Sequence, residues 1–134
     1  MEDIFQEFTF NNIYVRHAVN YSPDDSYCNM HIHTKCEIFY FVSGRAEYLV
    51  EGSKYPLEHG SVVIMRPAEA HRSKILADKL YERYTVNFPL SAADGIDPQR
   101  ILMEPFLDRP LGMGNLYFPS EFDGTAIENY FKKI

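Results

Sequence analysis

Short runs of aromatic and β-branched residues, separated by turn residues, fill the first two thirds of the chain. The breaks are Asn11-Asn12, the SPDD segment at 22–25, Gly44 and Gly52. Proline presets a turn dihedral, and asparagine and aspartate side chains bond to nearby backbone amides, so these breaks indicate turns. Short and regularly spaced strands predict a sandwich or a closed barrel. The predicted strands cover residues 4–10, 12–19, 37–44, 46–52, 61–65, 71–76 and 80–88.

The pattern changes after residue 88, where loop-like and helical segments follow. Residues 97–106 predict a short helix, because Asp97 is a favourable N-cap and Pro98 suits the first helical position. Residues 115–119 (NLYFP) predict one more strand or an extended link. The last predicted helix still runs where the sequence stops, so we expect a fragment of a longer protein. Its apolar residues recur at helical spacing: Ile127, Tyr130, Phe131 and Ile134.

Composition and charge narrow the class of protein. The chain has 134 residues, 46% of them hydrophobic and 15% aromatic, which favours a folded domain rich in β structure. Its formal net charge is −6, so a basic DNA-binding face is not expected. No apolar run approaches the ~20 residues that a membrane helix requires, and MEDIFQEF lacks the features of a secretory signal. We expect a cytoplasmic protein with no membrane contact, in which Cys28 and Cys36 are reduced.

Three potential metal ligands share one face of a predicted strand. His31, His33 and Glu37 have odd numbers, so their side chains point the same way along a strand. Lys35 shares that parity, which indicates a bend or bulge between His33 and Glu37. His71 begins a later strand that can lie alongside and supply a fourth ligand. Imidazole nitrogens and a carboxylate suit a divalent transition metal such as Zn, Ni, Fe or Mn.

The same residues fall in two longer motifs. The segment HIHTKCEIFYFVSG resembles the first motif of the cupin superfamily, and GSVVIMRPAEAH resembles the second. More narrowly, both segments are similar to the N-terminal domain of AraC-type transcription regulators, over roughly residues 4–88. The chain departs from the general cupin pattern where Asp25 and Glu69 stand near expected glycines and Ile75 replaces an asparagine. The matched residues are His31, His33, Glu37, Gly44, Gly60 and His71.

The resemblance implies an all-β fold, a cupin double-stranded β-helix (jelly-roll barrel) with short C-terminal helices. It implies an effector-binding barrel over residues 1–92. It also implies a helical extension over residues 93–134, which begins the dimerisation and linker region. In such regulators the barrel binds a small molecule and a separate helix-turn-helix domain binds DNA. We therefore expect a homodimer that contacts DNA only through a domain absent from this chain.

Two phenylalanines, two tyrosines and two arginines are candidate ligand contacts. The phenylalanines continue the parity of Glu37 toward the barrel interior, where ordinary core packing is the alternative interpretation. The tyrosine hydroxyls suit a polar ligand and the guanidiniums suit an anion or a sugar, with a solvated surface position as the alternative for each. These candidates are Phe39, Phe41, Tyr48, Tyr84, Arg16 and Arg66.

Two functions fit these observations. The first is the sensing of a sugar or related metabolite by a regulator domain that is not an enzyme. The alternative is a stand-alone metal-dependent cupin enzyme, such as an isomerase, a decarboxylase or a dioxygenase. Catalysis needs an acid or base beside the metal, and the motifs place no carboxylate besides Glu37, which is already a ligand candidate.

Overall fold

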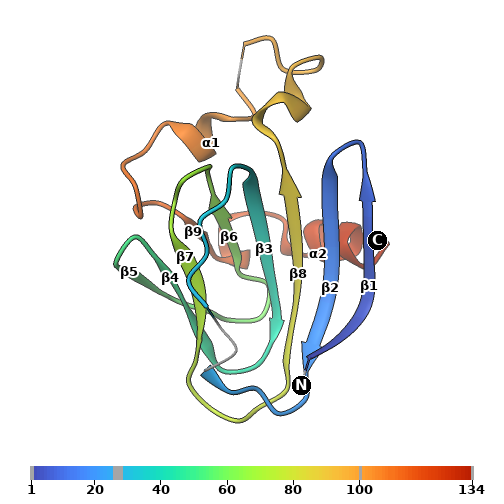
Figure 1. Ribbon diagram of the computed structural model, residues 1–134, viewed down its shortest axis with the longest axis vertical. Coiled ribbons are helices and arrows are strands. Elements are labelled where there is room, and N and C mark those ends of the chain that lie inside the picture. Colours follow the sequence, from blue (N-terminus) through green and yellow to red (C-terminus); the bar gives the residue numbers. More distant parts are fainter. Residues whose placement is uncertain (1, 26–28, 100, 134) are drawn as a thin grey trace.

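The computed structural model describes residues 2–25, 29–99 and 101–133. Two antiparallel sheets face each other, with strand orders β1-β2-β8-β3-β6-β9 and β5-β4-β7 (Figure 1). The predicted strands are confirmed, and β5 is an addition that follows the turn at Gly52. The strands are β1 (Glu2–Phe10), β2 (Ile13–Asn20), β3 (Cys36–Ser43), β4 (Ala46–Val50), β5 (Ser53–Pro56), β6 (Val62–Met65), β7 (His71–Ile75), β8 (Tyr81–Phe88) and β9 (Leu116–Tyr117).

The main hydrophobic core lies between the two sheets. Alternation along β3 turns Phe39 and Phe41 inward, where both are almost fully buried, and turns Tyr40 to the outer face. Burying one such phenylalanine contributes about 1.5–3 kcal/mol relative to leaving it in water. The two phenylalanines pack with side chains from both sheets: Ala46, Tyr48, Val50, Val63, Met65 and Tyr81.

A second cluster covers one end of the large sheet on its outer face. Cys36 and Ile64 pack there against Met103 and Phe106, which belong to the segment after the barrel strands. The predicted helix over 97–106 is wrong, because α1 spans only Glu104–Leu107. Proline at 105 has no N–H for a carbonyl one turn earlier, so a helix cannot run through it unbroken. Asp97 still caps this segment, since its carboxylate accepts hydrogen bonds from the backbone N–H groups of residues 101 and 102.

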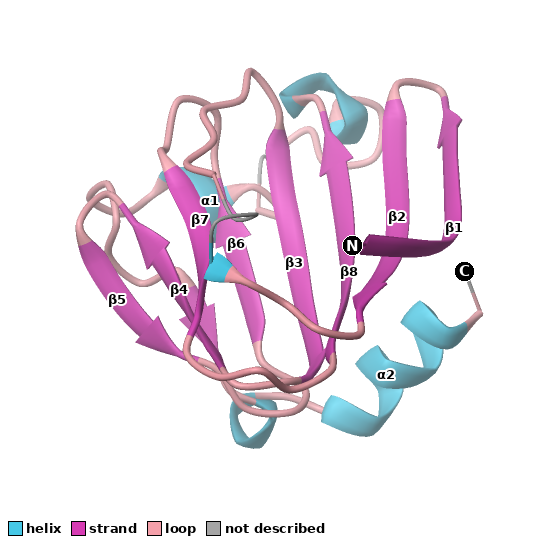
Figure 2. Cartoon of the chain, turned by 60° about the horizontal axis from the view of Figure 1, so that its bottom comes forward, coloured by secondary structure: helices cyan, strands magenta, loops and turns pink. Residues whose placement is uncertain are grey.

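The predicted C-terminal helix is confirmed as α2 (Gly124–Lys132), which packs against the outer face of the large sheet (Figure 2). Asp123 caps it by accepting a hydrogen bond from the N–H of Ala126 at 3.1 Å. The ring of Phe131 stacks on Tyr40 at a centroid distance of 4.6 Å and lies tilted against Tyr84 at 5.3 Å. The predicted apolar stripe is only partly correct, because Tyr130 is 68% exposed; Ile134 lies outside the described residues. No helix among the described residues is long and apolar enough to cross a membrane.

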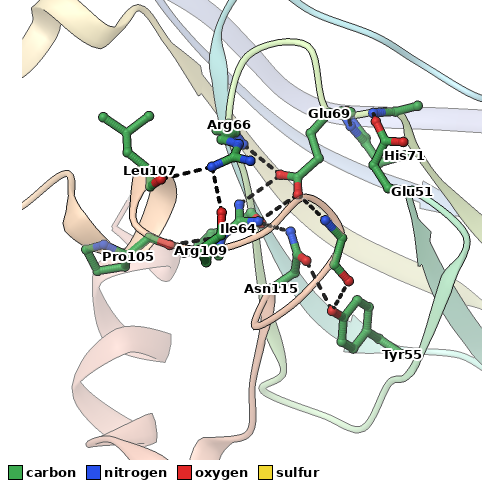
Figure 3. A network of polar contacts seen from close by, with 12 residues as sticks. Glu51, Tyr55, Ile64, Arg66, Glu69, His71, Pro105, Leu107, Arg109 and Asn115 are labelled. Atoms are coloured by element: carbon green, nitrogen blue, oxygen red, sulfur yellow. Dashed lines mark hydrogen bonds and ion pairs between the residues drawn. The ribbon is translucent and has the colours of Figure 1, made fainter.

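A buried ion pair ties the segment after the barrel strands to the turn between β6 and β7 (Figure 3). The carboxylate of Glu69, which is 0% exposed, accepts two hydrogen bonds from the Arg109 guanidinium, at 2.6 and 2.8 Å. It also accepts from the backbone N–H groups of Gly112 and Arg66. Position 112 requires glycine, because its φ is +73° and an added Cβ would lie 2.7 Å from the carbonyl oxygen of Val50.

We call this network of Glu69, Arg66, Arg109 and Gly112 the Glu69 clasp. The Arg66 guanidinium completes it by donating to the backbone carbonyls of Leu107 and Arg109, at 2.9 and 2.8 Å. Burial raises the pKa of the Glu69 carboxyl, but the hydrogen bonds from Arg109, Gly112 and Arg66 outweigh burial and lower it to about 2. The carboxylate is therefore ionised and fully partnered at neutral pH.

Candidate functional site

A cavity of about 210 Å³ lies between the sheets, with walls from β2, β3, β4, β7, β8 and the segment before β3. Strand alternation explains which side chains reach it, since every second residue of β8 from Tyr81 to Asn87 points inward. Aromatic rings and polar groups share the lining. The lining residues are Tyr14, Arg16, Asn29, His31, His33, Glu37, Phe39, Tyr48, Arg72, Ser73, Tyr81, Arg83, Thr85 and Asn87.

Of the four candidate metal ligands, His31, His33 and Glu37 line this cavity, and His33, Glu37 and His71 form a tight group beside it. The ligand atoms of His33, Glu37 and His71 all lie within 4.8 Å of one another. Oε1 of Glu37 is 3.4 Å from Nε2 of both histidines. His31 joins them through a two-bond backbone bridge to His71, and its ring centroid is 5.6 Å from that of His33 and 6.1 Å from that of His71.

Further contacts orient two of these side chains. Nδ1 of His71 donates a hydrogen bond to the backbone carbonyl of Glu69 at 2.8 Å, so the neutral ring keeps its lone pair on Nε2. Among the described residues that Nε2 has no hydrogen-bond partner, although it is buried and faces Glu37. The hydroxyl of Tyr48 donates to the other oxygen of Glu37 at 3.2 Å. A buried lone pair beside a carboxylate attracts a cation, so these residues could hold a divalent metal.

The charges in this group favour an ionised carboxylate. Burial raises the pKa of Glu37, but His33 and His71 outweigh it and lower the pKa to about 2. Burial lowers the pKa of His71, and the contact with Glu37 overcomes this effect and raises it. The pKa of His31 is lowered, first by burial and then by the charges of His33 and His71. The site thus concentrates negative charge at Glu37, which either a protonated histidine or a metal ion can match.

Two arginines on neighbouring strands also face the cavity, and we call Arg16 (β2) and Arg83 (β8) the arginine pair. Arg83 is 9% exposed, and its guanidinium donates to Asn20 and lies 4.3 Å from the ring centroid of Tyr81. Burial lowers the pKa of Arg16, and the nearby charge of Arg83 lowers it further. A third arginine, Arg72, lines the wall in a two-point ion pair with Asp25, at 3.1 and 3.3 Å.

Three of the six predicted ligand contacts line the cavity: Phe39, Tyr48 and Arg16. The other three do not. Phe41 is sealed in the core, Arg66 belongs to the Glu69 clasp, and Tyr84 points outward against α2. The prediction missed Arg83, Thr85 and Asn87, which alternation places together on one face of β8, because alternation alone does not say which face is inward.

The overall fold is shared with solved structures at low sequence identity. A cupin 2 conserved barrel domain protein from Salinispora arenicola has 21% identity and a TM-score of 0.54, covering 73% of this chain and 82% of its own. A predicted oxalate decarboxylase from Thermotoga maritima has 19% identity and a TM-score of 0.53, and the match covers 60% of this chain and 70% of that protein. An RmlC-like cupin with a double-stranded β-helix fold from Methanocaldococcus jannaschii has 11% identity and a TM-score of 0.56, and the match covers 66% of this chain and 81% of that protein.

These likenesses define the class of protein: the chain folds as a cupin double-stranded β-helix, as predicted. A family model, described as the AraC-like ligand binding domain, matches residues 12–125. The match spans most of the sequence, and the chain belongs to this family. No curated protein matches the sequence.

Proposed function

We propose that this chain is the effector-sensing domain of an AraC-type transcription regulator that acts in the cytoplasm. The observation that carries the proposal is the cavity, in which aromatic rings, hydroxyls, amides and charged groups converge within a domain of the ligand-binding family. Its volume of about 210 Å³ is below the ~300–1,000 Å³ typical of pockets for drug-sized ligands. A small polar metabolite, such as a sugar or sugar derivative, suits this space.

The metal-binding group would form one end of the proposed effector site. A divalent ion such as Zn²⁺, Ni²⁺, Fe²⁺ or Mn²⁺, held by His33, Glu37 and His71, would supply a Lewis-acid contact for a ligand oxygen. Tyr48 holds the carboxylate of Glu37 in place, and His31 lies at the exposed side of the group.

Strand β8 supports a route from the cavity to the rest of the regulator. Arg83 and Thr85 face the cavity, whereas Tyr84 between them packs against Phe131 of α2 on the other side of the sheet. A ligand that orders β8 would therefore change how α2 packs against the sheet. We propose that this change is passed on through a homodimer, and that a separate domain contacts DNA, because this chain is acidic.

A cavity-filling substitution tests effector binding. A metabolite library is screened by thermal shift, and the hits are measured by calorimetry on the wild-type chain and on Thr85→Trp. We expect at least one saturable hit that Thr85→Trp abolishes. Ser91→Trp is the matched control, because Ser91 is exposed outside the cavity, and this variant should bind normally. A hit that binds Thr85→Trp as tightly as wild type would contradict the assignment of the cavity.

A metal-dependent cupin enzyme is the second candidate, favoured by the His33–Glu37–His71 group. We propose binding instead of catalysis, because Glu37 is the only acid among the described lining residues and it is held by Tyr48 and both histidines. Incubation of each hit with the metal-loaded chain, followed by mass spectrometry, separates the two candidates. The sensing proposal expects the hit to be recovered unchanged, and turnover would establish an enzyme.

A further inference from the structure

The turn of residues 66–70 contacts the candidate metal ligands at two points of its backbone. The N–H of Ala68 donates to the carbonyl of His33 at 2.8 Å, and the carbonyl of Glu69 accepts from Nδ1 of His71 at 2.8 Å. His71 also follows this turn directly in the chain, as the first residue of β7. The position of the turn therefore determines where His71 lies and which of its ring nitrogens carries the proton.

The backbone of this turn has a conformation that its own residues do not favour. The N–H of Glu69 donates to the carbonyl of Arg66 at 3.3 Å and closes a β-turn. Pro67 suits the second position of such a turn, but the third position has a φ of +66°, in the left-handed region that favours glycine, and Ala68 occupies it. A strained turn persists only where the surrounding structure fixes it. The contacts that the turn makes with other segments therefore maintain its shape.

The Glu69 clasp supplies such contacts from the segment after the barrel strands (Figure 3). The Glu69 carboxylate accepts two hydrogen bonds from Arg109 and one from the N–H of Gly112. It also accepts from the N–H of Arg66, the first residue of the turn, at 3.0 Å. The carboxylate and the carbonyl that binds His71 belong to the same residue, so a displacement of the carboxylate would also displace that carbonyl.

Two acceptors compete for the proton of the neutral His71 ring. The carbonyl of Glu69 lies 2.8 Å from Nδ1, whereas Oε1 of Glu37 lies 3.4 Å from Nε2. The shorter contact keeps the proton on Nδ1 and leaves the lone pair of Nε2 toward Glu37, which is the form that can bind a metal ion. If the carbonyl of Glu69 moved away, the carboxylate of Glu37 would attract the proton to Nε2. The lone pair would then be lost from the site.

We infer that Glu69 is a positioning residue of the effector site: by binding Arg109, its carboxylate fixes the carbonyl that sets the tautomer of His71. This inference rests on the proposed function and adds the segment after the barrel strands to the parts of the chain that shape the site. It also gives a reason for a glutamate near a position where the general cupin pattern expects glycine. A glycine there would have no side chain to bind Arg109.

NMR of the full chain labelled with ¹⁵N-histidine tests the inference without metal or effector. Long-range couplings between ring nitrogens and ring protons identify each tautomer at alkaline pH, where the rings are neutral, and loss of signals in His71→Ala assigns His71. Wild type should carry the His71 proton on Nδ1. Arg109→Met should shift the proton toward Nε2, although Arg109 is outside the described cavity lining. Arg109→Lys should retain more of the Nδ1 form, because it keeps the charge that binds Glu69.

Calorimetry with Zn²⁺ on the same folded proteins gives a second readout. The affinity for Zn²⁺ should fall at least about tenfold in Arg109→Met, because loss of a contact that orients a metal ligand typically costs 10–100-fold. The double variant Glu69→Gln/Arg109→Met leaves no unpaired charge, so it carries the same test if Arg109→Met does not fold. Val19→Ala is the control for lost stability, since Val19 is buried on β2 outside the described cavity lining, and it should keep the wild-type tautomer and affinity.

The inference would be overturned by a wild-type His71 with its proton on Nε2, or by an unchanged tautomer in the folded clasp variants. A shift in Val19→Ala as large as that in Arg109→Met would overturn it as well, because the effect would then follow stability alone. If wild type bound no Zn²⁺, the metal part of the proposed function would fail, and the tautomers would still decide the inference. Failure of effector binding is detected separately, by the library screen with Thr85→Trp.

Discussion

The Glu69 clasp and the arginine pair both contain buried charge, and they differ in what the charged groups face. In the clasp the Glu69 carboxylate receives four hydrogen bonds, from Arg109, Gly112 and Arg66. In the cavity two guanidiniums of like sign share one space, and burial together with the charge of Arg83 lowers the pKa of Arg16. The charges of the clasp join two segments of the fold, whereas the arginines of the pair line a cavity that can admit a small molecule.

The largest effect on the free energy of unfolding is expected from breaking the Glu69 clasp. Arg109→Met removes the partner of a carboxylate that is 0% exposed, so unfolding free energy should fall by about 3–5 kcal/mol. Urea denaturation measures the change. The double variant Glu69→Gln/Arg109→Met should lose less than the sum of the two single variants, because no unpaired charge remains. A loss below about 1 kcal/mol in Arg109→Met would show that the clasp does not stabilise the fold.

The clasp also predicts a dependence of stability on acid. The pKa of Glu69 is lowered from 4.5 to about 2 in the folded chain, so its contribution is complete above pH 4.5 and is lost as the pH falls toward 2. Glu37 contributes in the same direction, with a pKa of about 2. Denaturation midpoints measured between pH 7 and pH 2 should therefore decrease more steeply in wild type than in Glu69→Gln. If the midpoints of wild type and Glu69→Gln decreased equally with pH, Glu69 would not be a source of the acid dependence.

A third prediction concerns the metal-binding group. A divalent metal such as Zn²⁺ at 100 times its Kd should stabilise the chain by about 2.7 kcal/mol, because it binds only the folded state. His71→Ala and Glu37→Gln should abolish this stabilisation in thermal denaturation. His59→Ala is the control, since His59 bonds to Val42 and Glu128 on the outside of the barrel. Stabilisation that survives in His71→Ala would place the metal elsewhere.

The smallest effect is expected from the arginine pair in the absence of ligand. Arg16→Gln removes the repulsion between Arg16 and Arg83 together with the attraction between Arg16 and Glu37, and these two changes in free energy oppose each other. The unfolding free energy should change by less than about 1 kcal/mol, in contrast to Arg109→Met. Urea denaturation of both variants under identical conditions checks the contrast. If Arg16→Gln lowered the free energy of unfolding as much as Arg109→Met does, the two clusters would not differ in their contribution to stability.

The His33–Glu37–His71 group and the barrel could be predicted from the sequence because both depend on local patterns. The spacing of His31, His33 and Glu37 and the two motifs identified the group, and strand alternation identified the inward face of β3. The Glu69 clasp could not be predicted, because it joins Glu69 to Arg109 across 40 positions of chain. Nothing local in the sequence indicates that a loop after residue 107 returns to the turn before His71.

The ligand contacts were predicted less well for the same reason. Phe39 and Tyr48 follow from alternation along their own strands, but Tyr84 and Arg83 are neighbours in sequence and lie on opposite faces of β8. Which face of β8 is inward depends on its pairing with β2 and β3. The helix predicted over 97–106 failed because a helix cannot run unbroken through Pro105, which is tolerated only in a first turn, and α1 has it there.

NMR of the side chains tests the central comparison most directly. The chain is labelled with ¹⁵N-arginine, and the Nε–Hε signals are assigned with Arg→Gln variants and followed during titration with the tightest hit of the metabolite library screen. We predict that the signals of Arg16 and Arg83 shift and saturate together, while the signal of Arg109 stays in place. A shift of the Arg109 signal without a shift of Arg16 and Arg83 would contradict the account, because the ligand would then act on the clasp and not in the cavity.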